Sequence, residues 1–347
     1  MARTWTRWLP AAAVPLVVAG SFAVATTTAG ADELPERSPE DVLTLLAGHE
    51  HQPLSGEFTQ TSDLGLPELP ADVPGTDGDA AAVLDGLELI TSDHTGRVFV
   101  GDQDQARIQL FDSFGEQNAI VNGSDAWFYD SADNSATHVT APEGEHSDQA
   151  RGAQQLTPEA LAEQVVAAAD PSTELSVRGN VEVAGRTAYD LVLTPRTDST
   201  LVGEVSIAVD GETGLPLRVS ITASGADSPA VEVAYTELDL SPPDADLFDF
   251  TPPADATVEE VDPQGHDGQH GADSSQPRPQ ATGTGWETVL AAPAGTLDLS
   301  TQPILTQLTS AVDGGRVLTT DLLTVLITDD GRVLAGAVPL ERLQAAA

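Results

Sequence analysis

Residues 203–224, GEVSIAVDGETGLPLRVSITAS, hold two stretches of alternating apolar and polar side chains on either side of a short turn. Val205, Ile207 and Val209 alternate before the turn, and the same period of two continues after it. The turn, Asp210–Gly214, contains the Asp and Gly residues that tight chain reversals favour. Because a period of two places alternate side chains on one face of a strand, this segment predicts a β-hairpin.

The strand pattern extends along the chain in both directions. AVEVAYTELD follows the hairpin, and LSVRGNVEVAG and TAYDLVLTP precede it. Between Leu84 and Pro142, shorter alternating pairs recur, namely Leu87 and Leu89, Val98 and Val100, Ile108 and Leu110, and Trp127 and Tyr129. Strands at this spacing, separated by turns, predict a mainly β (α+β) fold in which an antiparallel sheet curls into a sandwich or a barrel.

Two segments have the pattern of amphipathic helices. Residues 38–50, SPEDVLTLLAGHE, begin with a capping Ser and a Pro in the first turn, and Val42, Leu45 and Leu46 share one face. Residues 157–169, TPEALAEQVVAAA, begin in the same way with Thr and Pro. We therefore expect one helix before the first strand and one between the two groups of strands.

The N-terminus has the three regions of a secretory signal peptide. Arg3 and Arg7 precede an uncharged, mostly apolar run over residues 11–25, and a small-residue site ends at Ala31. The run has 15 residues, whereas a membrane-spanning helix needs roughly 20. We predict cleavage after Ala31 and an extracytoplasmic protein, secreted or held in the cell envelope; an uncleaved anchor is the alternative.

Composition narrows the possible partners and chemistry. The formal net charge is −41 at pH 7, which disfavours nucleic acid and anionic lipid headgroups as electrostatic partners. The chain has no cysteine, so disulfides, thiolate metal sites, thiol nucleophiles and a lipid-modified N-terminal cysteine are all excluded.

Breaks in the strand pattern predict the domain boundaries. Residues 62–82 are rich in Pro, Gly and Asp and predict a loop insertion. Residues 262–283 are almost without apolar side chains and predict a flexible linker. Beyond it, residues 284–347 predict a small module with a helix over 304–312 and a hairpin over 322–339.

No segment has the pattern of a catalytic or cofactor site, and we predict neither an enzyme nor a cofactor. The chain has no G-x-S-x-G, Walker or G-x-G-x-x-G motif, and no pair of its many acids stands out. His266 and His270 have the spacing of helical metal ligands, but the glycines around them favour a flexible linker, so no metal is expected. The aromatic triple at residues 127–129 fits either core packing or the lining of a ligand cavity.

Three motifs, in this order, resemble a known family. They are NGSDAWFY at Asn122–Tyr129, DGETGLPLR at Asp210–Arg218 and LFDFTPP at Leu247–Pro253. Residues 38–261 are similar to the LolA-like periplasmic lipoprotein carriers and to the RseB/MucB-type sigma-factor regulatory proteins that share their fold. The Lys-free, Cys-free, Ala-rich composition looks actinobacterial.

This resemblance implies an incomplete antiparallel barrel with helices filling its open side and a hydrophobic cavity between them. Its implied partners are lipid or lipoprotein acyl chains, with a membrane anti-sigma factor as the alternative. The candidate lining residues are inward members of the strands and of the first helix: Leu46, Phe58, Leu89, Val100, Leu110, Trp127, Ile207 and Val219. Alternation divides each strand into two sets of side chains without deciding which set faces the cavity.

Overall fold

The computed structural model describes residues 34–49, 52–65, 92–101, 104–111, 115–140, 157–168, 172–261, 280–294 and 308–347. Residues Leu34–Ala347 form one compact unit. The predicted signal peptide, most of the predicted loop insertion, Leu89 and the His266/His270 pair lie outside the described residues. None of the described helices is long and apolar enough to cross a bilayer.

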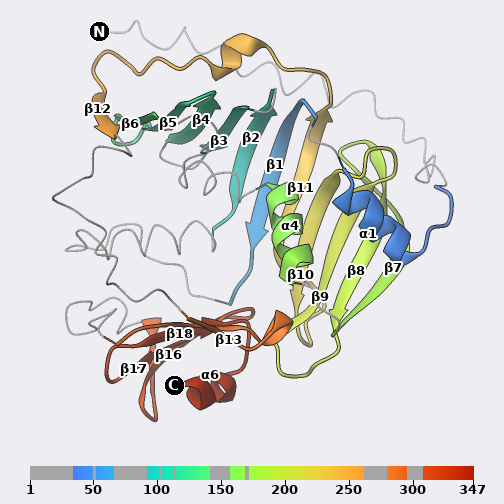
Figure 1. Ribbon diagram of the computed structural model, residues 1–347, viewed down its shortest axis with the longest axis vertical. Coiled ribbons are helices and arrows are strands. Elements are labelled where there is room, and N and C mark those ends of the chain that lie inside the picture. The colour runs from blue at the N-terminus through green and yellow to red at the C-terminus, as the bar shows by residue number, and fades with distance from the viewer. Residues whose placement is uncertain are drawn as a thin grey trace, which may run out of the picture. The chain divides into compact units, whose positions relative to one another are not determined.

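One large curved sheet of twelve strands dominates the fold (Figure 1). The order across it is β12-β6-β5-β4-β3-β2-β1-β11-β10-β9-β8-β7, antiparallel throughout except for the pairing of β12 with β6. Since β12 and β7 end that order, the sheet stays open, which confirms the predicted mainly β fold with an incomplete barrel. The strands are β1 (Leu54–Ser62), β2 (His94–Val100), β3 (Gln105–Phe111), β4 (Glu116–Asn122), β5 (Asp125–Asp130), β6 (Ser135–Thr140), β7 (Thr173–Val183), β8 (Arg186–Pro195), β9 (Val202–Asp210), β10 (Pro216–Ala223), β11 (Pro229–Asp239) and β12 (Thr257–Val261).

The predicted hairpin is confirmed as β9 and β10, and its turn is held by a buried carboxylate. Asp210 is 1% exposed and accepts hydrogen bonds from Nε of Arg186 at 3.1 Å and from Nη2 at 2.9 Å. It also accepts from the backbone N–H and the hydroxyl of Thr213 at 3.0 and 2.5 Å. Gly214 completes the turn with φ of +79°, and a Cβ there would lie 2.4 Å from the carbonyl oxygen of Leu45.

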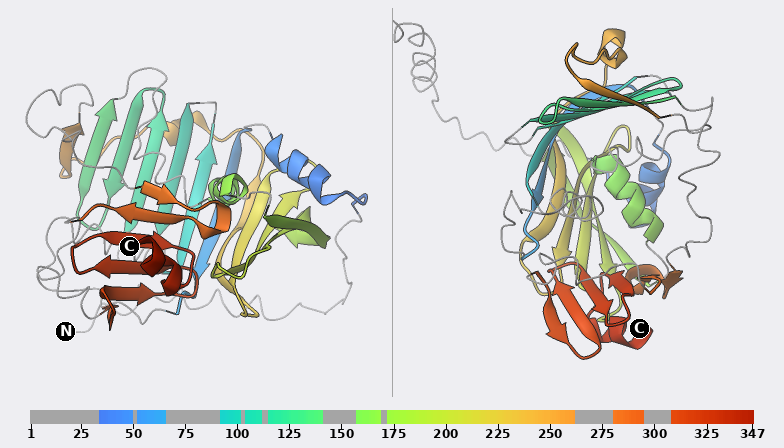
Figure 2. Two further views of the ribbon diagram at one scale, coloured as in Figure 1. Left: turned by 60° about the horizontal axis from the view of Figure 1, so that its bottom comes forward. Right: turned by 90° about the vertical axis from the view of Figure 1, so that its left-hand side faces the viewer.

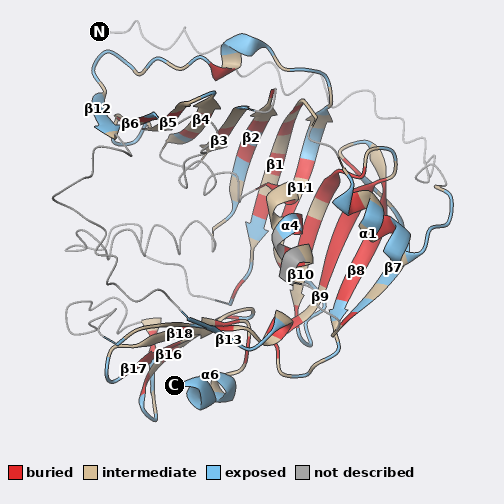
Figure 3. Cartoon of the chain, in the orientation of Figure 1, coloured by how far each residue is buried: buried red, intermediate tan, exposed pale blue. Residues whose placement is uncertain are grey.

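Both helices predicted before β11 are confirmed, and they lie on the sheet (Figure 2). Helix α1 (Pro39–Ala47) begins at Ser38, whose hydroxyl accepts from the N–H of Asp41 at 3.2 Å. It packs on β7, β8 and β9, whereas α4 (Pro158–Ala168) packs on β10 and β11. Burial is densest on β8, β9 and β10 under these helices (Figure 3).

The C-terminal residues form a second, six-stranded antiparallel sheet in the order β13-β14-β18-β17-β16-β15. The predicted hairpin over 322–339 is confirmed as β17 and β18. The elements are β13 (Gln280–Thr282), β14 (Val289–Ala292), β15 (Ser310–Val312), β16 (Gly315–Thr319), β17 (Thr324–Thr328), β18 (Val333–Gly336) and the terminal helix α6 (Leu340–Ala346).

The helix predicted over 304–312 is wrong at its C-terminal end. Residues Ser310–Val312 form β15, which pairs with β16 so that Val312 lies opposite Gly315. Asp313 and Gly314 are then the two turn residues, and Gly314 has φ of +83°. An Asp-Gly pair favours a two-residue hairpin turn, and this outweighs the helical spacing of the apolar residues before it.

The second sheet is tied to the end of the large one through Trp286. This residue lies in the short 3-10 turn η3 (Gly285–Glu287), is 9% exposed and belongs to the same core cluster as α1 and β8. Its indole N–H donates to the hydroxyl of Thr173 at 2.8 Å. The N–H of Leu201 donates to the carbonyl of Ala337 at 2.8 Å. Residues 280–282, at the end of the predicted linker, form β13.

Candidate functional site

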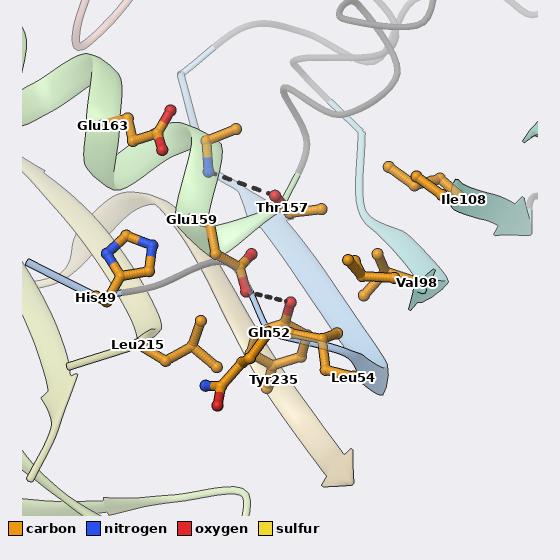
Figure 4. A pocket seen from close by; sticks show the side chains of 13 residues that line it. His49, Gln52, Leu54, Val98, Ile108, Thr157, Glu159, Glu163, Leu215 and Tyr235 are labelled. Carbon is orange, nitrogen blue, oxygen red and sulfur yellow. Dashed lines mark hydrogen bonds between the residues drawn. The ribbon is translucent and has the colours of Figure 1, made fainter. Parts of the chain in front are cut away.

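A cavity of about 200 Å³ lies between the start of α4 and the face of the large sheet at β1, β2, β3 and β11 (Figure 4). Both apolar and ionisable side chains line it. Its lining residues are His49, Gln52, Leu54, Val98, Val100, Ala106, Ile108, Thr157, Glu159, Ala160, Glu163, Leu215 and Tyr235.

The register of three strands makes one wall of the cavity apolar. Leu54 on β1 pairs with Val100 on β2, and Val98 on β2 pairs with Ile108 on β3. Paired residues in antiparallel strands project to the same face of a sheet, so these aliphatic side chains lie side by side. Leu215, from the β9–β10 turn, adds to this lining.

Beside this wall, a hydrogen-bonded pair of ionisable groups joins the sheet to the start of α4. The hydroxyl of Tyr235 on β11 donates to Oε1 of Glu159, in the first turn of α4, at 2.6 Å. Burial raises the pKa of Glu159, against hydrogen bonds from Tyr235, its own N–H and Thr157 that lower it. Burial and the neighbouring carboxyl group raise the pKa of Tyr235 well above its ordinary value, so its hydroxyl keeps its proton and remains the donor.

Two further polar groups flank this pair. The Nδ1 atom of His49, just beyond α1, lies 2.5 Å from the carbonyl oxygen of Leu46. The hydroxyl of Thr157 accepts from the N–H of Ala160 at 3.4 Å, which caps the start of α4. These contacts hold the polar groups in place and keep the backbone at the cavity rim hydrogen-bonded.

Apolar side chains continue from the cavity along the same face of the sheet. The pairings extend two rows across β2 to β6. One row contains Val98, Ile108, Ala119 and Phe128, and the other contains Val100, Ala106, Val121, Ala126 and Val139. With strands about 4.8 Å apart, the five steps from β1 to β6 span about 24 Å. Phe128, Ala119 and Val121 along these rows are only partly buried.

The structure places the eight sequence-predicted lining residues in different surroundings. Val100 lines the cavity. Phe58 is fully buried, and Leu110 packs against its core cluster. Leu46, Ile207 and Val219 lie in the other cluster, which α1 and α4 form with the strands beneath them. Leu89 lies outside the described residues, and contact of any of the eight with a ligand stays a prediction.

Trp127 lies on the face of the sheet opposite Phe58. It stacks on His138 with ring centroids 4.1 Å apart and lies 5.5 Å from the ring of Phe250. The segment around Phe250 covers this face, since Arg107 donates to the carbonyl of Leu247 at 3.0 Å. Two of the three resembling motifs therefore pack against each other, and of the aromatic triple only Phe128 points to the cavity side.

Sequence reasoning missed the polar half of the site. In the sequence, Glu159 resembles any acidic residue in a first helical turn, where it interacts favourably with the helix dipole. Tyr235 resembles any ordinary strand residue. The two are 76 positions apart in the chain. No local sequence pattern indicates that these two residues meet. The one usable signal for the site was an acidic residue next to the apolar residues of α4. Among the residues that the structure describes, no three His, Asp or Glu side chains group as metal ligands would.

No family model matches the chain, and no curated protein matches it significantly. Among solved structures, it is similar to a chain of the MucA/MucB complex of Pseudomonas aeruginosa, with 17% identity over 88% of this chain and 96% of that chain and a TM-score of 0.44. It is similar to an uncharacterised conserved protein of Thermus thermophilus, with 12% identity over 64% and 98% and a TM-score of 0.35. It is also similar to a LolA superfamily protein of Nitrosomonas europaea, with 10% identity over 62% and 99% and a TM-score of 0.24.

These solved structures include both groups that the sequence motifs resemble, the LolA-like proteins and MucB. Every identity is below 25% and every TM-score below 0.5. The function of this chain is therefore argued from its own residues.

Proposed function

We propose that this protein is a non-catalytic, extracytoplasmic binder of apolar chains, of the kind that lipids and lipoproteins carry as acyl groups. The observation that carries the proposal is the cavity wall of aliphatic side chains at Leu54, Val98, Val100 and Ile108. Burial of a methylene group against such a wall contributes about 0.8 kcal/mol to binding. The signal-peptide pattern of residues 1–31 supports the proposed location.

The size of the cavity limits how such a chain binds. It has a volume of about 200 Å³, whereas pockets that enclose a whole small ligand measure about 300–1,000 Å³. The described cavity therefore holds the end of a chain. We propose that the remainder follows the partly buried rows that contain Ala119, Val121 and Phe128 on the same face.

A homologous series of alkyl methyl esters tests this proposal. We expect each added methylene to tighten binding about fourfold until the cavity and the rows are filled. The measurement is displacement of the uncharged fluorescent probe N-phenyl-1-naphthylamine from the purified protein. Replacing Ala160, which lines the cavity from α4, with tryptophan should weaken binding at least about tenfold because the indole fills the space.

The matched control is Ala345→Trp, which places the same side chain at an exposed position of another helix, α6. Its affinity should stay within about twofold of the wild type, because a surface substitution away from the cavity changes neither packing nor space. An affinity that does not rise with chain length, or equal effects of the two variants, would reject the proposal.

The small volume also favours a second candidate, in which the cavity receives one apolar side chain of a protein partner, a membrane anti-sigma factor. Interface anchors of this type insert into pockets at the centre of a contact. We expect immobilised protein to recover an anti-sigma factor from solubilised membranes of the source cells, and Ala160→Trp to abolish the recovery while Ala345→Trp preserves it. Failure to recover one from cells under envelope stress would exclude this role.

A further inference from the structure

We infer that Glu159 makes the cavity select apolar chains by the charge of their head group, admitting uncharged or cationic heads and rejecting anionic ones. The inference rests on the proposed function and adds the class of ligand to it. Its basis is the set of groups at the polar side of the cavity, where the head of a chain seated against the aliphatic wall would be placed.

The ionisable groups at that side are mostly acidic. Glu159 and Glu163 both line the cavity, and His49 is the one imidazole among the lining residues that the structure describes. Among the described lining residues there is no arginine, and the chain contains no lysine at all. An anionic head would therefore meet two carboxyl groups without a permanent positive charge to balance it.

The start of α4 does not supply that missing charge. The exposed N–H groups of a helix N-terminus attract anions. Here the carboxyl group of Glu159 already occupies the first turn, and the hydroxyl of Thr157 accepts from the N–H of Ala160. The hydroxyl of Tyr235 is likewise directed to Glu159, at 2.6 Å. The N–H of Ala160 and the hydroxyl of Tyr235 are thus engaged with groups of the protein itself.

The two acidic residues differ in how strongly they repel an anionic head group. Glu163 is exposed, so water and salt screen its charge. Glu159 is held between α4 and the sheet, where the lower polarity strengthens its repulsion of a second negative charge. Glu159 is therefore the residue that determines specificity, and Glu163 provides the natural comparison at the same cavity.

Acidification should relax this selection. Burial raises the pKa of Glu159, so that it takes up a proton at a higher pH than an ordinary carboxyl group and then no longer repels an anion. The other groups that line the cavity near it are Tyr235 on β11, Thr157 just before α4, Glu163 on α4, and His49 just beyond α1. A variant of Glu159 isolates the contribution of this carboxyl group from those of its neighbours.

The test uses three compounds with ten-carbon chains and different heads, anionic decanesulfonate, uncharged methyl decanoate and cationic decyltrimethylammonium, each below the concentration at which it aggregates. Each displaces N-phenyl-1-naphthylamine from the purified protein. At about pH 8 we expect decanesulfonate to bind at least about tenfold more weakly than the methyl ester. Glu159→Gln should bring the two within about threefold, whereas Glu163→Gln, which removes a screened charge, should change the ratio by less than about twofold.

If Glu159→Gln does not fold, a pH series on the wild-type protein replaces it, and the ratio should fall as the pH is lowered. Equal binding of the anion and the ester by the wild type would overturn the inference and leave the proposed function standing. If neither the probe nor any of the three compounds binds, the proposed function fails and the inference fails with it.

Discussion

Replacing Arg186 with leucine should lower the free energy of unfolding by about 3–5 kcal/mol, because it leaves a buried carboxylate without its partner. Asp210 is 1% exposed and receives two parallel hydrogen bonds from the guanidinium, at 3.1 and 2.9 Å. The same carboxylate holds the turn between β9 and β10 through Thr213. Urea unfolding at neutral pH measures the loss.

The control for this variant is Arg97→Leu. Arg97 pairs with Glu57 at 3.3 Å, but their side chains are 53% and 35% exposed. Exposed ion pairs contribute about 0–1 kcal/mol, so this variant should lose less than about 1 kcal/mol. Equal losses for the two variants would show that the buried position of Asp210 does not matter.

The effect of Arg186→Leu should shrink in acid. Burial by itself would raise the pKa of Asp210, but hydrogen bonds from Arg186 and Thr213 outweigh it and lower the pKa. A group whose pKa is lowered by folding stabilises the protein above its unfolded pKa, about 3.9 for Asp, and that stabilisation is lost as pH falls below it. The gap between wild type and variant should therefore narrow below about pH 4.

Replacing Phe58 with alanine should lower the free energy of unfolding by about 3–5 kcal/mol. Phe58 is fully buried, and its ring lies over Gly96, where a Cβ would come within 2.5 Å of the ring atom Cζ. Because Gly96 has no side chain, the ring of Phe58 fills the space above it. Truncation of Phe58 to alanine therefore leaves a cavity there. Thermal and urea unfolding of the variant measure the loss.

The matched control is Phe99→Ala. Phe99, on β2, lies on the face of the sheet opposite to Phe58 and is only partly buried. Its truncation should therefore lower the free energy of unfolding less than that of Phe58. Binding also separates core from cavity: where Phe58→Ala remains folded, its affinity for methyl decanoate should stay within about threefold of the wild type. A loss of about tenfold or more would place Phe58 among the ligand contacts.

Local sequence patterns predicted most of the fold. The hairpin at Asp210–Gly214 and the helix starts at Ser38 and Thr157 follow from short-range steric and hydrogen-bonding preferences, which a linear sequence records directly. The same local reasoning failed at Ser310–Val312, where apolar residues at helical spacing form a strand. There the Asp-Gly turn and the pairing with β16 determine the conformation.

The candidate site could be predicted only in part. The family resemblance implied that apolar side chains would line a cavity, and Val100 lines the one described. Trp127 had the same alternation, yet its face is covered by Phe250 and the segment around Leu247. Period-two alternation divides a strand into two equivalent sets, and only the elements packed on each face distinguish them.

By itself, the sequence determined that this is a cysteine-free, strongly acidic protein built of antiparallel strands with two early helices. Those properties depend on composition and on residues near one another in the chain. Only the tertiary structure decided that Glu159 meets Tyr235 across 76 positions, beside a wall made from β1, β2 and β3. The hydrogen bond between them and the aliphatic wall beside it require strand register and helix placement, which arise when the strands pair and α4 packs on β10 and β11.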